Sequence, residues 1–224
     1  ATINGAQALT LTSGTGTIDL NAAIGGSTAL ALVTLSGQTI DIDGNLTASA
    51  LTATSGITTF NSDTFAITTT GAANTAGGAV SITATGALTV GAITTTGGAD
   101  ADAGGADGAG LVALSGGDLT TTGAITATGA ADNGSNAVGG TGGVVTLTAT
   151  DGSPLITLGA GIDTSGGGGS GAGVGGNVTV NDITTLSAGV AITTGAGAGN
   201  ITFTSDATIN GAQALTLTSG TGTI

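Results

Sequence analysis

The sequence contains no lysine, arginine or histidine, and its 13 acidic residues are all aspartate, so the formal net charge is −13. A chain without cationic side chains cannot neutralise phosphates or the negative surface of a membrane. No apolar run reaches the roughly 18 residues that a membrane-spanning helix needs. We therefore expect no nucleic-acid partner and no insertion into a membrane.

Cysteine, methionine, tryptophan and tyrosine are also missing, and phenylalanine occurs only three times. The absence of cysteine excludes disulfides and thiol chemistry. Pairs of aspartates could hydrolyse glycosides, but no pair stands apart from the scattered aspartates, and aromatic platforms for sugars are absent. The sequence therefore predicts a protein that is not an enzyme and has no cofactor, with calcium as the one ion left open.

The residues that are present favour β-structure. Glycine (46 residues) and threonine dominate, and 39% of the chain is hydrophobic, nearly all of it alanine, valine, isoleucine and leucine. This apolar content is too high for a disordered chain. Short runs such as VSITATG, ALTVG and NVTVN alternate apolar and polar residues between glycines, which indicates half-buried strands. We expect an all-β chain.

One segment occurs twice. ATINGAQALTLTSGTGTI occupies residues 1–18 and recurs unchanged at residues 207–224. A match of this length is not a coincidence, and it marks a tandem repeat. We expect residues 1–206 to form one long unit of a continuous β-solenoid and residues 207–224 to begin the next identical unit.

A shorter pattern lies inside the long unit. The stretches 80–110, 111–143 and 144–176 each contain three short strands followed by a long glycine-rich loop. The remainder divides less regularly into 177–199, 200–223, 18–39, 40–56 and 57–79. Three strands per coil without helical segments predict a parallel β-solenoid of triangular cross-section, with about eight coils and roughly 38 Å of axial length per unit.

The same pattern predicts a ridge and a core. The long loops at 97–110, 129–143 and 163–176, with a shorter one near 71–79, should all leave one corner and form a ridge along one edge. The apolar residues of the strands should point inward. The residues that we expect in the core are Leu9, Leu11, Ile82, Leu88, Ile93, Leu119, Ile125, Val178, Ile192, Ile201 and Phe203.

Five aspartates are candidate calcium ligands. Asp41 and Asp43 stand two residues apart, hence on one face of a strand, while Asp100, Asp102 and Asp107 share the loop sequence DADAGGAD. Carboxylates in flexible glycine-rich loops suit Ca²⁺, although neither stretch matches an EF-hand or a glycine-rich nonapeptide repeat. The alternative is that these aspartates are solvated and keep a rod soluble and unbundled.

Threonine rows raise a second hypothesis. In LTLT, ITTT, VTLTAT and ITFT, threonine occupies alternate positions, and stacked coils would align these hydroxyls. Such faces resemble those of ice-binding β-solenoids, but threonine also has a high strand propensity and decorates many solenoids. Four N-x-S/T triplets, at Asn45, Asn133, Asn177 and Asn200, are expected by coincidence in so threonine-rich a chain.

At the level of phrases such as SITATGALTVGAITTTGG and NITFTSDATINGAQALTLTSG, the whole chain resembles the giant repetitive surface proteins of bacteria. These include filamentous-haemagglutinin-like adhesins and related long β-solenoid exoproteins. The resemblance implies export, a right-handed parallel β-helix, and a rod that displays adhesive elements or builds an extracellular fibre. Such adhesins usually carry some lysine and arginine and have divergent repeats. This chain has no cations and an unchanged overlap, which favours a uniform filament.

We therefore expect a structural protein that forms an extracellular or cell-surface filament or stalk. Its expected partners are further copies of the same repeat, stacked end to end, and the sequence leaves open whether filaments also have lateral filament neighbours. One alternative is the shaft of a large bacterial surface adhesin. A second alternative is a surface solenoid that binds ice or calcium.

Overall fold

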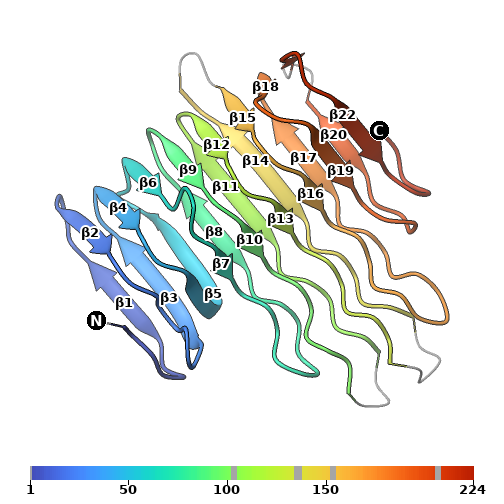
Figure 1. Cartoon of the computed structure of the whole chain (residues 1–224), viewed down its shortest axis with the longest axis horizontal. Coiled ribbons are helices and arrows are strands. Elements are labelled where there is room, and N and C mark those ends of the chain that lie inside the picture. The colour runs from blue at the N-terminus through green and yellow to red at the C-terminus, as the bar shows by residue number, and fades with distance from the viewer. Residues whose placement is uncertain (1, 102–104, 134–137, 152–154, 205–207) are drawn as a thin grey trace.

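The computed structural model of the chain describes residues 2–101, 105–133, 138–151, 155–204 and 208–224. Within these residues the chain forms strands and no helix, and every pair of neighbouring strands is parallel. The chain winds steadily from one end of the molecule to the other, so its two termini lie at opposite ends (Figure 1). The prediction of an all-β chain of parallel strands is confirmed, and the arrangement is consistent with a β-solenoid.

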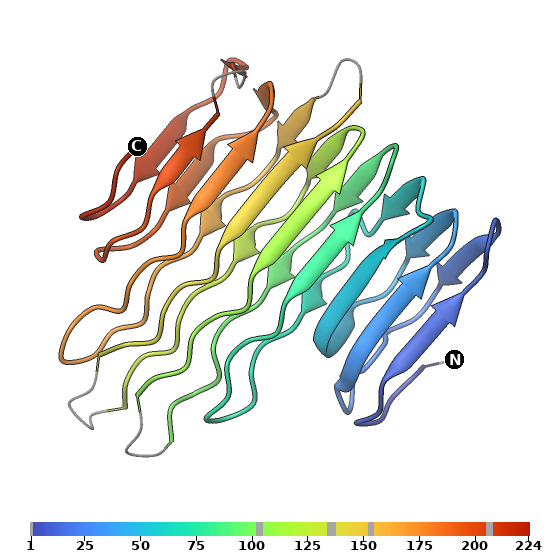
Figure 2. The ribbon, with the colours of Figure 1, turned by 180° about the vertical axis from the view of Figure 1, so that it is seen from behind.

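The strands stack in three rows, which we call face 1, face 2 and face 3. Face 1 contains β1 (Leu9–Thr12), β3 (Leu30–Ser36), part of β5 (Leu46–Ser55), β8 (Val80–Thr83), β11 (Val112–Gly116), β14 (Val145–Ala149), β17 (Val178–Asn181) and β20 (Ile201–Phe203). Seen from behind, the strands of this face form a continuous row of arrows from blue to red (Figure 2).

Faces 2 and 3 are built from shorter strands. Face 2 contains β2 (Thr17–Leu20), β4 (Thr39–Ile42), β6 (Thr59–Asn61), β9 (Leu88–Val90), β12 (Leu119–Thr121), β15 (Ile156–Leu158), β18 (Thr184–Leu186) and β21 (Ile209–Asn210). Face 3 contains the start of β5 followed by β7 (Ile67–Thr68), β10 (Ile93–Thr94), β13 (Ile125–Thr126), β16 (Ile162–Asp163), β19 (Val190–Thr193) and β22 (Leu215–Thr218). The chain visits faces 1, 2 and 3 in turn.

Inward apolar residues of successive strands lie in register and form the core. On face 3, Ile67, Ile93, Ile125, Ile162 and Ile192 occupy one column and are all buried. Of the residues that we expected in the core, those in the middle of the chain are buried. Those nearest the two ends are partly buried against the core: Leu9, Leu11 and Phe203. The inward assignments are therefore confirmed.

The pattern of strands differs from the expected one between residues 40 and 79. The stretch 57–79 supplies two strands, β6 and β7, instead of three. The preceding stretch, 40–56, does supply three positions, β4 and both parts of β5, because Leu46 pairs with Ile67 on face 3 and Leu51 pairs with Val80 on face 1. No glycine interrupts β5. Its inward residues are Leu46 and Ala48 before the corner and Leu51 and Ala53 after it, and the alternation shifts by one residue at Ser49 and Ala50, where the strand passes from one face to the next.

The long loops leave one edge of the molecule, as expected. They connect face 3 to face 1, between β7 and β8, β10 and β11, β13 and β14, and β16 and β17. Their described residues project together beyond the ends of the strands (Figure 1). The ridge predicted from the sequence is therefore confirmed for this part of the chain.

Ser62 is a polar residue in the apolar core. Its side chain is buried, and its hydroxyl has no hydrogen-bond partner among the described residues. Because an unpaired buried hydroxyl carries a desolvation cost, we expect Ser62→Ala to raise the free energy of unfolding by about 1 kcal/mol. Denaturant unfolding followed by circular dichroism measures this change. Ser81→Ala, on the outer side of β8, serves as the control, and equal effects of both substitutions would contradict the prediction.

Candidate functional site

Asp41 and Asp43 lie at the end of β4. Asp41 lies half-buried on the outer side of β4, in a column with Asp19 and Asn61. The Asn61 Nδ2 group donates a hydrogen bond of 3.0 Å to Asp41 Oδ1. Asp43 follows the strand and is exposed. Asp41 therefore meets residues of neighbouring coils, and sequence spacing alone could not reveal that pairing.

The second group of candidate calcium ligands lies in the loop between β10 and β11. Asp100 is only 6% exposed, and its Oδ2 accepts a hydrogen bond of 3.1 Å from the Asn133 backbone N–H. The Asn133 side chain donates to the Asp100 carbonyl oxygen over 2.7 Å. Asp107 is partly buried, and Asp102 lies outside the described residues. The Asp100 carboxylate is thus bound to the next loop of the ridge.

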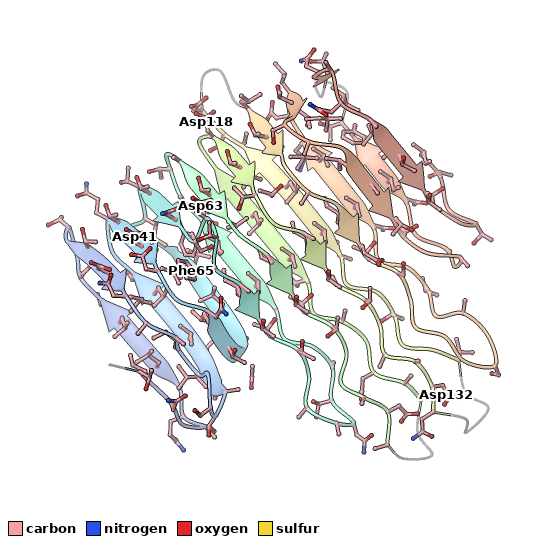
Figure 3. The ribbon with its side chains drawn as sticks, in the orientation of Figure 1. Asp41, Asp63, Phe65, Asp118 and Asp132 are labelled. Atoms are coloured by element: carbon pink, nitrogen blue, oxygen red, sulfur yellow. The ribbon has the colours of Figure 1, made fainter. Side chains whose placement is uncertain are left out.

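Across the part of the chain that the structure describes, no three aspartates gather into a group that could hold a metal ion. Asp41, Asp63 and Asp118 lie in the N-terminal half of the molecule, and Asp132 lies at the opposite edge with the long loops (Figure 3).

The outer side of face 1 carries two columns of hydroxyl groups. The first column runs through Thr10, Thr34, Thr52, Ser81, Ala113, Thr146, Thr179 and Thr202. Beside it, Thr83, Ser115 and Thr148 are followed by Asn181. Neighbouring groups lie about 4.8 Å apart along the axis and about 7 Å apart along each strand. The expected threonine rows therefore exist, with one alanine and one register shift between β3 and β5 as interruptions.

Face 2 has one outward column along its whole length. It consists of Asp19, Asp41, Asn61, Thr89, Thr120, Thr157, Thr185 and Asn210. A second outward column, Thr17, Thr39 and Thr59, is present only on β2, β4 and β6, where its neighbours in the first column are Asp19, Asp41 and Asn61 rather than hydroxyl residues. Of these two faces, face 1 is therefore the one on which two columns of hydroxyls lie side by side.

A set of buried threonines closes the necks of the long loops. The Thr95 hydroxyl donates to the Gly110 carbonyl oxygen over 2.8 Å, while the Gly110 N–H donates to the Thr95 carbonyl oxygen over 2.8 Å. Thr164 and Gly176 make the same reciprocal pair, at 2.6 and 2.8 Å. We call this pair a threonine–glycine clip. Thr69 with Gly78 repeats it.

The clips were missed in the sequence, although a signal exists. In ITTTG the middle threonine is the second inward position after the isoleucine, because inward residues alternate. That spacing predicts a buried threonine, and a buried hydroxyl needs a partner. The partner lies across a loop of variable length, so the sequence does not identify it.

We expect Thr164→Val to lower the free energy of unfolding by about 1–2 kcal/mol, because the Gly176 carbonyl oxygen loses its donor in a buried site. Denaturant unfolding followed by circular dichroism measures the loss. Thr126→Val, at an outward position of the same face, is the matched control and should change stability by less than about 0.5 kcal/mol. A loss no larger than that of the control would show that the clip contributes nothing.

The glycine-rich loops are stacked and linked to one another. The Gly167 N–H donates to the Gly140 carbonyl oxygen in the preceding loop over 2.8 Å. The two arms of one loop are linked as well, since Gly173 N–H donates to Gly167 O and Gly140 N–H donates to Ala130 O. The ridge is therefore a layer of hydrogen-bonded backbone.

Glycine is required where these backbones meet. A Cβ atom on Gly167 would lie 1.7 Å from the Ala130 carbonyl oxygen, and one on Gly140 would lie 2.0 Å from that of Asp107. No side chain fits such a distance. The glycine content of this edge thus follows from close packing of the loops.

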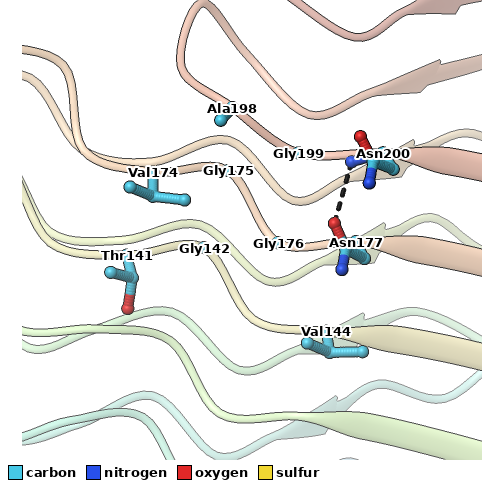
Figure 4. A pocket seen from close by; sticks show the side chains of 10 residues that line it. All are labelled: Thr141, Gly142, Val144, Val174, Gly175, Gly176, Asn177, Ala198, Gly199 and Asn200. Carbon is cyan, nitrogen blue, oxygen red and sulfur yellow. Dashed lines mark hydrogen bonds between the residues drawn. The ribbon is translucent and has the colours of Figure 1, made fainter. Parts of the chain in front are cut away.

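A shallow hollow of about 260 Å³ lies where three coils pass from the ridge to face 1 (Figure 4). Its wall is mostly glycine backbone with Val144 and Val174, and both of these side chains are exposed. The Asn200 N–H donates to Asn177 Oδ1 over 2.8 Å, and the Thr223 N–H donates to Asn200 Oδ1 over 2.9 Å. These asparagines link neighbouring coils, and the hollow contains no ionisable side chain.

Searches against protein-family models, curated proteins and solved structures find no match. Within the described residues, no helix is long and apolar enough to cross a membrane.

Proposed function

We propose that this chain is a structural protein, in which tandem copies of the 206-residue unit form one continuous extracellular filament or stalk. Each unit would be a right-handed parallel β-helix with three strands per coil and about eight coils. The observation that carries the proposal is the stacking of residues 208–224, which begin the second copy, directly onto the coil before them. Leu215 pairs with Val190, and Leu217 pairs with Ile192.

The last coil presents the kind of surface that such a filament would use. Strands β21 and β22 each have a neighbour on one side only among the described strands, and β20 is followed by Thr223, whose carbonyl oxygen accepts from the Ile201 N–H. Parallel strands with unpaired N–H and C=O groups accept a further strand. A next copy would continue the same ladders, so the filament would grow by the interaction that holds the coils together.

Composition supports an extracellular filament as well. A net charge of −13 per chain repels neighbouring rods and keeps them soluble. The absence of lysine and arginine removes every trypsin site, and the few bulky side chains leave little for other proteases. The proposed role is mechanical: continuous backbone ladders along the axis would supply stiffness, and the packed core would prevent the coils from slipping.

Small-angle X-ray scattering from chains with one, two and four tandem copies tests the proposal. We expect the maximum dimension to increase by about 38 Å per copy, because each copy adds about eight coils at 4.8 Å, while the radius of the cross-section stays constant. Copies joined by flexible segments would instead give a dimension that grows more slowly than the number of copies. That result would contradict a continuous rod.

The paired hydroxyl columns of face 1 support a second candidate function, binding of ice. Ordered hydroxyls about 4.8 Å apart in one direction and about 7 Å in the other could order a layer of water. Thermal hysteresis is the direct measurement. If face 1 binds ice, Thr146→Asp removes the activity and Thr157→Asp, on face 2, keeps it. No hysteresis in the unmodified chain would exclude this function and leave the filament unaffected.

A further inference from the structure

The repeated 18-residue segment occupies different faces in its two copies. In the first copy Ile3 bridges to Ile24, which in turn bridges to Leu46 at the start of β5, so Ile3 belongs to face 3. In the second copy the same residue is Ile209, which pairs with Thr184 of β18 on face 2. The second copy therefore begins one face earlier than the first.

The next strand of the segment shows the same displacement. LTLT at Leu9–Thr12 forms β1, which pairs with β3 on face 1. LTLT at Leu215–Thr218 forms β22, which pairs with β19 on face 3. In both places the leucines are partly buried and the threonines are exposed.

The last residues of the segment show the same displacement by one face. Thr17 pairs with Thr39 on face 2. Its counterpart Thr223 accepts a hydrogen bond of 2.9 Å from the Ile201 N–H, which continues the ladder in which Asn200 accepts from Val178 on face 1. Three separate parts of one segment are thus displaced by one face in the same direction.

The sequence permits this displacement because the segment carries nothing specific to a face. It consists of short strands in which apolar and polar residues alternate, joined by short turns that contain glycine. Such a turn fits at the corner after face 1 in the first copy and at the corner after face 3 in the second. The cause lies earlier, in 57–79, where two strands stand in place of three. The unit therefore ends one face short of a whole number of coils.

We propose that the next 206-residue unit, which begins with residues 207–224, continues from the end surface formed by β21, β22 and Thr223, and that each successive unit is displaced by one face. This inference rests on the proposed stacking of copies. Because there are three faces, every third copy returns to the same orientation, after about 110 Å along the axis. The glycine-rich ridge, which joins face 3 to face 1, would join face 2 to face 3 in the next copy and so wind around the filament.

The displacement has a consequence for the hydroxyl array. The paired threonines of β1 lie on face 1, and their counterparts Thr216 and Thr218 lie on face 3. A filament built in this way has no single flat hydroxyl face along its whole length. The arrangement favours the structural role over binding to an extended planar surface.

Cysteine cross-linking in the present chain tests the displacement, since the chain has no cysteine of its own. Ala191 and Thr216 are register partners and both are exposed. Parallel neighbours about 4.8 Å apart are within the range for a disulfide. We expect Ala191→Cys with Thr216→Cys to form an intramolecular disulfide under mild oxidation, detected by mass spectrometry.

A second pair of cysteines tests the alternative in which the second copy is not displaced. If Thr216 took the place of its counterpart Thr10 on face 1, it would lie beside Thr202. Thr202→Cys with Thr216→Cys should therefore cross-link about tenfold less than the first pair. The positive control is Thr94→Cys with Thr126→Cys. These two residues are register partners on neighbouring strands in the middle of face 3.

The outcomes separate the two proposals. Preferential linkage of Thr202→Cys with Thr216→Cys would overturn the displacement and leave a continuous filament intact. If the control pair links and neither test pair does, residues 208–224 do not stack on the preceding coil. That result would overturn both the displacement and the proposed filament.

Discussion

Ile93→Asp is expected to lower the free energy of unfolding by about 4 kcal/mol or more, because it places an unpaired carboxylate in the dry core. Ile93 is fully buried and lies in register between Ile67 and Ile125. A charge at this position has no cation to meet, since the chain has none. The coils on both sides would lose their contact, and we expect unfolding to begin there.

Circular dichroism during thermal and denaturant unfolding measures the effect. Thr94→Asp is the matched control, because Thr94 points outward and Asp163 already occupies the same column two coils further on. We expect this control to change stability by less than about 0.5 kcal/mol. If Ile93→Asp were as stable as Thr94→Asp, the inward assignment of the isoleucine column would be wrong.

Gly167→Ala is expected to lower the free energy of unfolding by about 3 kcal/mol, because the added methyl group has no room. Its Cβ would lie 1.7 Å from the Ala130 carbonyl oxygen, which is backbone. Only separation of the two loops relieves the clash. The hydrogen bond from Gly167 to Gly140 would then be lost as well.

The neighbouring glycine provides the control. Gly168 is exposed, and a Cβ atom added to it meets nothing within 4 Å. Gly168→Ala should therefore change stability by less than about 0.5 kcal/mol. Amide hydrogen exchange in 129–133 and 138–143 provides a second measurement, with faster exchange expected only in Gly167→Ala. Equal behaviour of the two variants would mean that the loops are not stacked.

Much of the fold could be predicted from alternation alone. The column of Ile67, Ile93 and Ile125 and the position of the long loops follow from period-two patterns and glycine turns, both of which are local in sequence. The path of β5 could not be predicted in this way. Leu46 to Ser55 reads as one strand, and only pairing with β7 and β8 shows that it serves two faces.

The candidate site residues were harder to predict because their partners are distant in sequence. Asp41 meets Asn61 and Asp100 meets Asn133 across coils of different length. The clip between Thr95 and Gly110 spans a whole loop. The displacement of the repeat depends on the total number of strands in the unit. The sequence pattern predicts three strands in 57–79, whereas the structure has two. This difference of one strand is enough to conceal the displacement.

The filament, the clips and the stacked loops give one physical account of the composition. Threonine supplies outward strand positions and buried clip hydroxyls, and glycine supplies turns and close loop packing. Aspartate supplies negative charge, and the chain has no cationic side chain that could pair with it. Cysteine and aromatic side chains are not needed, because a long rod gains stability by adding coils.

Electron cryomicroscopy of a chain with several tandem copies tests the central claim most directly. We predict strand ladders spaced by about 4.8 Å that pass through each boundary between copies without interruption. The ridge of loops should move to another edge in each successive copy and return after three copies. Separate compact bodies joined by extended segments, with ladders that stop at each boundary, would contradict the account.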